Sequence, residues 1–315
     1  NSSEKVILKI KEILYSLKIY DLQKIKFFNC DIRDEYRLRE IFENQQKTKK
    51  PIDSVIHFAG LKSVKESLDK PFLYWDNNVG GSIKLVKIMS EFNCKNLVFS
   101  SSATVYDANK KKIINEETNL KPINPYGETK LAIENFLKSI SNNDIKNWRI
   151  ACLRYFNPIG AHPSGLIGES PIGMPNNVFP IICQVALGKI DKLRIFGNNW
   201  PTHDGTGVRD YIHVLDLAKA HLKSIEYIKR RKPGCIFLNV GTSLGTSVLD
   251  LIRTFEKVNN CSINYIFTDR RSGDYAQVVA DNKLLSKLIN WEPEYSLEDM
   301  CRDGWKWQIN NPLGY

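Results

Sequence analysis

Tyr126 and Lys130 stand four residues apart in the segment NPYGETK and form a pair suited to proton transfer. Residues at this spacing on a helix lie on one face, with their Cβ atoms about 5 to 6 Å apart. A lysine ammonium beside a phenol stabilises the phenolate, lowers its pKa from the ordinary value of about 10, and makes the tyrosine a usable general base. The spacing occurs on many amphipathic helices, so its meaning depends on the residues around it.

A serine-rich run, SSSATVY at residues 100–106, ends an apolar stretch upstream of this pair. In an open α/β sheet, ligands bind beyond the carboxyl ends of the strands. A hydroxyl group there, that of Ser102, can hydrogen-bond the substrate oxygen that the tyrosine deprotonates. Ser102, Tyr126 and Lys130, in this order on a strand end and a helix, resemble the catalytic set of the extended short-chain dehydrogenases/reductases.

The elements that must position these residues alternate between short apolar runs and longer segments of helical period. This β-α-β-α pattern predicts an α/β fold with a doubly wound, Rossmann-like parallel sheet covered by helices on both faces. The expected strands are residues 25–32, 54–60, 96–106 and 148–156, and the expected helices are residues 35–44, 72–92 and 126–141.

After Phe156 the chain changes character, because residues 157–177 form a Pro/Gly/Asn/Ser loop too long for a simple connector. We expect residues 1–157 to form a nucleotide-binding domain and residues 158–315 a smaller substrate-binding lobe, with some segments returning to the sheet. The later elements expected are helices at 177–188, 214–227 and 248–259, a loop at 197–211, strands at 235–241 and 263–268, and a final helical region ending in GWKWQINNP.

Composition excludes several classes of protein. The 315 residues are 42% hydrophobic and contain no apolar run long enough to cross a bilayer and no signal-peptide core. The formal charge of +10 comes with the basic clusters QQKTKK, NKKKI and KRRKP, which lack interleaved aromatics and indicate a solvated surface and not a nucleic-acid site. The seven cysteines contain no C-x-x-C pair and predict reduced thiols in a cytoplasmic protein without a metal site.

Longer segments narrow the resemblance to the UDP-glucose 4-epimerases. The segments that carry it are IHFAGLKSVKESLDKP, WDNNVGG, NLVFSSSATVY, NPYGETK, LRYFNPIGAHPSGLIGE, MPNN, GTGVRDYIHVLDLAKAH and RRSGD. The resemblance implies interconversion of UDP-glucose and UDP-galactose with NAD as cofactor, through a 4-keto sugar that turns over in the site. Tyr126 would be the base at the sugar 4-hydroxyl, Ser102 its hydrogen-bonding partner, and Lys130 the cation at the nicotinamide ribose.

The same resemblance implies the remaining contacts and a homodimer formed through the helices at 72–92 and 126–141. The two arginines Arg209 and Arg271 offer forked donors for a diphosphate, and Phe196 offers a face for uracil. The implied cofactor contacts are Asp31, Ile32, Phe58, Ala59, Gly60, Lys62, Asn77, Tyr126, Lys130 and Phe156. The implied UDP-sugar contacts are Ser102, Asn157, Asn177, Val178, Arg194, Ile195, Phe196, Arg209, Tyr211, Arg271, Asp274 and Val278.

The sequence departs from this family in two places. No glycine-rich phosphate-binding turn is found among its 18 glycines, so we expect roughly 30 to 40 residues, the first β-α-β unit, to be missing. On that expectation the chain as given would bind NAD weakly and be inactive. Val278 occupies a position where the family has a bulky tyrosine or a small residue that admits an N-acetyl group. UDP-N-acetylglucosamine 4-epimerisation, an inactive fragment and a non-catalytic family member therefore remain alternatives.

Overall fold

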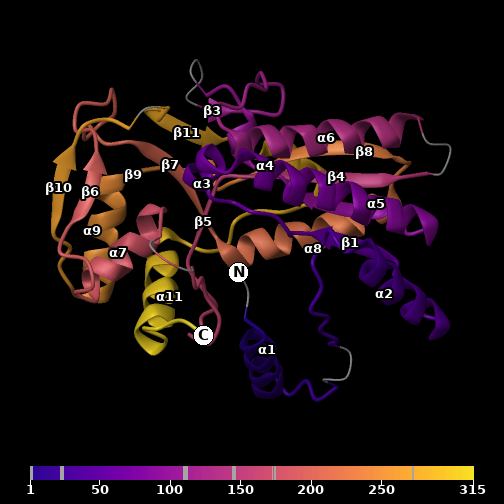
Figure 1. Cartoon of the computed structure of the whole chain (residues 1–315). Coiled ribbons are helices and arrows are strands. Elements are labelled where there is room, and N and C mark those ends of the chain that lie inside the picture. Colours follow the sequence, from indigo (N-terminus) through magenta and orange to yellow (C-terminus); the bar gives the residue numbers. More distant parts are fainter. Residues whose placement is uncertain are drawn as a thin grey trace.

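A parallel sheet of four strands, in the order β1-β2-β4-β8, forms the centre of the chain (Figure 1). The computed structural model describes residues 3–21, 25–108, 113–143, 147–171, 173, 175–271 and 273–315. The strands of this central sheet are β1 (Ser54–His57), β2 (Asn96–Ser100), β4 (Arg149–Tyr155) and β8 (Gly234–Val240). Since all four run in the same direction, their carboxyl ends meet at one edge of the sheet.

Helices cover both faces of this sheet, as the alternation along β4 shows. Ile150 and Cys152 are buried in one apolar cluster with residues of α5 and α6, whereas Ala151 and Leu153 are buried in another with residues of α8 and α10. A strand covered on both faces is mostly apolar, which is why β4 lacks the polar alternation of a half-exposed strand. This confirms the doubly wound α/β fold. The covering helices are α5 (Gly81–Glu91), α6 (Pro125–Asn143), α8 (Val214–Arg230) and α10 (Lys283–Ile289).

The rest of the second half builds smaller sheets beside the central one (Figure 1). Phe179 and Phe255, which come from two different helices, pack in one apolar core with residues of a two-stranded sheet. This core joins the two helices to that sheet. The strands are β3 (Ile113–Ile114), β11 (Gln277–Ala280), β7 (Val208–His213) and β5 (Asn157–Ile159), with β9 (Gly245–Ser247) antiparallel to β7, and the pair β6 (Leu193–Phe196) and β10 (Tyr265–Thr268). The helices are α7 (Val178–Ala186), α9 (Val248–Asn259) and α11 (Leu297–Asn310).

The helix expected at 72–92 is a continuous helical run with a wider turn inside it. A π-helical segment, Trp75–Gly80, connects α4 (Pro71–Tyr74) to α5. Such segments insert a residue into an α-helix and are frequent at functional sites. The remaining helices are α1 (Lys5–Ser16), α2 (Glu35–Lys47), α3 (Val64–Asp69) and the 3₁₀ turn Ala103–Val105.

Two sequence-based expectations are wrong, and two helices were not expected. Residues 25–31 form no strand, and Phe27 and Phe28 are exposed. β propensity alone does not make a strand, and no strand of the described part of the chain pairs with this segment. The loop expected at 197–211 contains the start of β7, whose residues pair with β5, β9 and β11. Neither α1 nor α3 was expected.

Within the described residues, no helix combines the length and the apolarity that a membrane crossing requires. All seven cysteines are free thiols, and four of them are buried. Residues 109–112 of the basic cluster NKKKI, together with Met174 and Ser272 of the family segments, lie outside the described residues.

Packing of α11 gives a first prediction, because Gly304 sits where a methyl group has no room. A Cβ atom added there would lie 2.4 Å from Cε1 of Phe179. Gly304→Ala should therefore lower the free energy of unfolding by about 1 to 3 kcal/mol, although alanine ordinarily favours a helix. The control is Gly80→Ala, whose Cβ would meet its nearest neighbour at 3.6 Å. Urea denaturation measures both variants, and a Gly304→Ala protein as stable as the parent would contradict the packing.

Candidate active site

One buried face of α6 carries the two residues of the proton-transfer pair. Tyr126 and Lys130 are 6% and 4% exposed, and one further turn along the same face Glu134 is 1% exposed. This face lies against the end of β2, where the Ser102 side chain is close enough to Tyr126 to lower the pKa of the phenol. Ser102 itself accepts hydrogen bonds from the backbone nitrogen and Oγ1 of Thr104, at 3.2 and 3.0 Å. The structure thus brings together Ser102, Tyr126 and Lys130.

The Lys130 ammonium is held at the end of β2. Its Nζ donates a hydrogen bond to the Ser100 carbonyl oxygen at 2.8 Å and lies 5.9 Å from the centre of the Tyr126 ring. Burial lowers the pKa of Lys130 to about 8, and the charge of Glu134 opposes that shift. Lys130 is therefore a cation that can lose its proton at moderately alkaline pH.

The pKa of Tyr126 shifts in the direction opposite to the one expected from sequence. Burial raises it, and the hydrogen bond with Ser102 opposes the rise. The reason is geometric, since the ammonium of Lys130 is bonded to Ser100 and lies beside the phenol ring without contacting its oxygen. Further positive charge near the phenol is needed before Tyr126 can act as a base near neutral pH.

Asn78 is a site residue that sequence reasoning missed. From the π-helical segment its side chain accepts a hydrogen bond from the Leu61 backbone nitrogen at 2.7 Å and donates to the Leu61 carbonyl at 3.0 Å and to Thr129 Oγ1 at 3.2 Å. It thereby fixes the turn after β1 against α6. Gly60 in this turn has φ +155°, and a Cβ atom there would lie 3.1 Å from Asn78 Oδ1. The expected residue Asn77 is its half-buried neighbour.

The residues expected at the cofactor lie along the carboxyl edge of the sheet and beside it. Phe58 is 57% exposed and its ring lies 4.5 Å from that of His221, while Ala59 and Gly60 follow it in the exposed turn. Phe156 is buried directly after β4. Lys62 forms an ion pair with Glu169 at 2.7 Å, so its ammonium bridges the turn after β1 to the loop after β5.

Asp31 and Ile32 precede α2, where no strand forms. The Asp31 carboxylate accepts hydrogen bonds from Arg33, which lower the pKa of Asp31 to about 2. Through its other nitrogen Arg33 also binds Asp76 at 2.7 Å, next to Asn77 in the π-helical segment. Ile32 packs on Gly81 at the start of α5, where an added Cβ would lie 2.5 Å from its methyl group. These contacts attach the segment to the sheet-covering helices.

Two arginines from different strands and loops share one carboxylate. Arg209 Nη2 lies 3.7 Å from Asp274 Oδ1, and Arg271 Nε donates to Asp274 Oδ2 at 3.1 Å. The Arg271 guanidinium also stacks on Phe196, 4.8 Å from the ring centre. Burial lowers the pKa of Arg209, and Asp274 opposes this shift. With two cations to one anion, the cluster retains a positive charge beside an aromatic face, which suits an anionic nucleotide.

The other expected substrate residues come from β5, β6, β7 and the start of α7. Asn157 of β5 pairs in register with Tyr211 of β7. Burial raises the pKa of the Tyr211 phenol to about 12. Asn177 and Val178 stand at the start of α7, and Arg194 is exposed on β6. Ile195 differs from the expectation, because its side chain is 2% exposed and packs into the core.

Val278 and Trp200 complete the surroundings. Val278 packs against the buried cluster that contains Phe156, and Ala103, the neighbour of Ser102, packs there too. Trp200 was not expected from the sequence, yet its Nε1 donates to the Phe196 carbonyl at 3.0 Å and Arg270 stacks on its ring at 4.1 Å.

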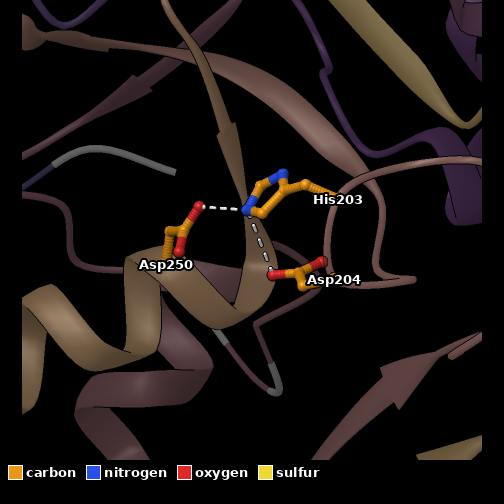
Figure 2. Close-up of side chains that lie close together, drawn as sticks. All are labelled: His203, Asp204 and Asp250. Carbon is orange, nitrogen blue, oxygen red and sulfur yellow. Dashed lines mark hydrogen bonds and ion pairs between the residues drawn. The ribbon is translucent and has the colours of Figure 1, made fainter.

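A second polar cluster joins the loop before β7 to the start of α9 (Figure 2). His203 Nε2 lies 2.8 Å from Asp250 Oδ2 and 3.6 Å from Asp204 Oδ2. Three side chains of this kind resemble a ligand set for a divalent ion. Asp204 also accepts hydrogen bonds from Thr206 and from Ser247, the N-cap of α9. These hydrogen bonds account for the arrangement as an anchor of the loop, so we assign it no ligand.

Comparisons with known proteins agree with this geometry. The family model described as GDP-mannose 4,6 dehydratase matches residues 1–304. A UDP-glucose 4-epimerase from Cyamopsis tetragonoloba is 46% identical over 100% of this chain and 87% of its own length. One from Bacillus subtilis is 44% identical over 100% of this chain and 89% of its own length.

Two crystal structures are similar over nearly the whole chain. That of UDP-glucose 4-epimerase from Stenotrophomonas maltophila with bound NAD and formylated UDP-arabinopyranose has a TM-score of 0.92 at 41% identity, covering 99% of this chain and 89% of that one. That of the Bifidobacterium longum enzyme with NAD+ and UDP has a TM-score of 0.89 at 41% identity, covering 100% of this chain and 90% of that one.

The Asn78 contacts give a prediction about stability. Asn78→Ala removes three hydrogen bonds, one buried and two part-buried, and should lower the free energy of unfolding by about 2 to 3 kcal/mol. Asn77→Ala, one residue earlier and half-buried, should change it by less than about 0.5 kcal/mol. Chemical denaturation of both variants separates the two positions, and equal effects would show that Asn78 does not hold the turn.

Proposed function

The chain belongs to the UDP-glucose 4-epimerases of the extended short-chain dehydrogenase/reductase family, and on that premise we propose that it interconverts UDP-glucose and UDP-galactose with NAD as its cofactor. The observation that carries the proposal is the buried face of α6, where Tyr126 lies beside the Ser102 side chain and the ammonium of Lys130. An enzyme with this activity is an isomerase.

The residues at the carboxyl edge of the sheet fit a nicotinamide dinucleotide. An ammonium has three donors, and within the described contacts that of Lys130 donates only to Ser100, so donors remain for ribose hydroxyls. Gly60 lets a ligand approach the backbone, and Phe58 offers an exposed ring. When bound, NAD supplies the acceptor and donor for the hydrogen at C4 of the sugar. The residues that would hold it are Asp31, Ile32, Phe58, Ala59, Gly60, Lys62, Asn77, Tyr126, Lys130 and Phe156.

Proton transfer at the sugar falls to Tyr126. Its phenolate takes the proton from the 4-hydroxyl, and Ser102 donates a hydrogen bond to the same oxygen, which stabilises the charge that develops there. The proton stays on Tyr126 and returns to the oxygen when the 4-keto sugar is reduced. Burial favours the neutral phenol and Ser102 opposes this effect, so the phenolate forms when further positive charge lies near the phenol.

The nucleotide part of the substrate is held apart from the reacting sugar. Arg209 and Arg271 bind the diphosphate and Phe196 stacks on uracil, and this anchoring leaves the 4-keto sugar free to turn its opposite face to the site. We assign NAD binding to residues 1–157 and UDP-sugar binding to residues 158–315. The further substrate contacts proposed are Asn157, Asn177, Val178, Arg194, Ile195 through its backbone, Tyr211, Asp274 and Val278.

Replacing Tyr126 tests the reaction directly. Tyr126→Phe should lower kcat for UDP-galactose by about 100-fold or more, because it removes proton transfer, while UDP binding by calorimetry stays unchanged. Tyr74→Phe is the matched control at another fully buried tyrosine, 0% exposed, and should keep kcat. A parent protein without epimerase activity would refute the function, whereas a fully active Tyr126→Phe protein would refute only the role of the base. The same assay with UDP-N-acetylglucosamine decides whether Val278 admits the N-acetyl group.

We also propose a cytoplasmic homodimer. Free thiols are typical of a reducing compartment. Apolar side chains stand exposed on α3, α4, the π-helical segment and α5, among them Leu68, Phe72, Trp75 and Ile83, with Phe72 89% exposed. A patch of this kind on adjacent helices suits a two-fold helical interface.

Sedimentation velocity tests the dimer. The parent protein should sediment as a dimer at micromolar concentration, and Phe72→Asp should shift it to the monomer because the interface would then bury a charge. Leu244→Asp changes a 69% exposed leucine before β9 and should leave the dimer intact. A monomeric parent protein would overturn the proposal.

A further inference from the structure

A buried ion pair connects α6 to the central sheet directly beside the proposed catalytic residues. Arg154 of β4 donates from Nε to Glu134 Oε1 at 2.9 Å and from Nη2 to Glu134 Oε2 at 2.6 Å. The two side chains are 3% and 1% exposed. The bidentate geometry fixes both the position and the orientation of the carboxylate.

The pair is the middle of a longer chain of buried hydrogen bonds. Ser101 Oγ donates to Glu134 Oε1 at 2.6 Å, so the carboxylate also holds the residue next to Ser102. On the other side, Arg154 Nη1 donates to the Tyr106 hydroxyl at 2.9 Å, and that hydroxyl donates to Asn239 Oδ1 of β8 at 2.7 Å. The network therefore spans α6, both ends of the segment 101–106, β4 and β8.

Stability alone does not explain such a pair. The desolvation of two buried charges largely offsets their attraction, and apolar residues of similar size often serve stability as well. A fully satisfied polar network instead fixes one arrangement of the groups that it connects. Here the connected groups are Ser101, which precedes Ser102, and the face of α6 that carries Tyr126 and Lys130.

We infer that Glu134 is a positioning residue for the reaction proposed above: clamped by Arg154, it fixes the end of β2 against α6 and places a negative charge one helical turn from Lys130. The inference rests on the proposed function. Glu134 acts through two neighbours, since Ser101 sets the place of Ser102 and the charge favours the ammonium form of Lys130.

Among the groups around Lys130, Glu134 is the one whose charge favours the ammonium form. Burial lowers the pKa of Lys130 to about 8, and Glu134 is the group that opposes the shift. Burial lowers the pKa of His57 on β1 to about 3 and that of His221 on α8 to about 4, so both are neutral in the working range. Removing the carboxylate must therefore lower the pKa of Lys130 further. The groups that face Lys130 from the packed elements are His57, Ser100 with His221 behind it, Tyr126, and Glu134 paired with Arg154.

The first experiment measures Lys130 without cofactor or substrate. In protein labelled with ¹⁵Nζ-lysine, the Lys130 resonance, assigned by its loss in Lys130→Arg, is titrated with pH. Glu134→Gln should move its midpoint down by about one pH unit, and Glu134→Asp, which keeps the charge, should move it much less. Glu128→Gln is the matched control, since Glu128 lies on the same helix but is exposed, and it should leave the midpoint unchanged.

The second experiment measures turnover. Glu134→Gln should move the alkaline limb of kcat to lower pH by the same amount and lower kcat about tenfold above it, with KM changed less than about threefold. Because this variant leaves Arg154 buried without its partner and can fail to fold, Glu134→Leu/Arg154→Met serves as the second variant. It strands no charge, should keep the unfolding temperature of the parent protein, and should shift the limb in the same direction.

The outcomes separate the two claims. An inactive parent protein refutes the proposed function, whatever the titration shows. If the parent protein is active, a second comparison tests Glu134. The positioning role of Glu134 is refuted if Glu134→Gln, or a folded double variant, has the same titration midpoint, alkaline limb and kcat as Glu128→Gln.

Discussion

The pairing of β4 with β8 is the constraint on which the rest of the molecule depends. It joins strands from the two halves of the chain in parallel, with seven residue pairs from Arg149–Gly234 to Tyr155–Val240. In this register Arg154 stands beside Asn239, so the Tyr106 hydroxyl can bond both. The same pairing brings a strand from the second half of the chain into the central sheet.

Cations near the candidate site keep a positive charge that their neighbours do not fully neutralise. Burial removes the ammonium of Lys130 from water. It hydrogen-bonds the Ser100 carbonyl oxygen and lies one helical turn from the Glu134 carboxylate, so Lys130 remains a cation with a lowered pKa. The arginine cluster also keeps a net positive charge, because Arg209 and the exposed Arg271 share Asp274. Each site thus holds a charge that a complementary ligand group would stabilise.

Local patterns in the sequence predicted the elements that bury a regular stripe or a continuous apolar run. The helix that carries Tyr126 and the strands at 54–60 and 148–156 were found this way, since their periodicity is a property of their own residues. The segment 25–32 was misassigned and the start of β7 was missed, because in both cases pairing with distant segments decides the structure.

The candidate site residues divide in the same way, between those that a local sequence pattern indicates and those that it does not. Ser102, Tyr126 and Lys130 follow from spacing on a strand end and a helix, whereas the arginines and Phe196 came from family resemblance, because their loops carry no periodic signal. Asn78 was missed because a π-helical segment turns it, and not Asn77, toward Leu61 and Thr129. Glu134 was missed because a glutamate in a helix usually lies on its solvated face, although its spacing from Lys130 marked the buried one.

The π-helical segment Trp75–Gly80 also determines which changes the helix can accept. Loss of one residue there would let the run from α4 to α5 close into a regular α-helix, and since the wide turn already absorbs that residue, the helix on either side would keep its faces. The buried residues Leu85, Ile88 and Met89 would then still face the sheet, and the change would fall on Asn78 and its hydrogen bonds to Leu61. A variant one residue shorter in this segment should therefore keep the packing of α5 on the sheet and lose the attachment of the turn after β1.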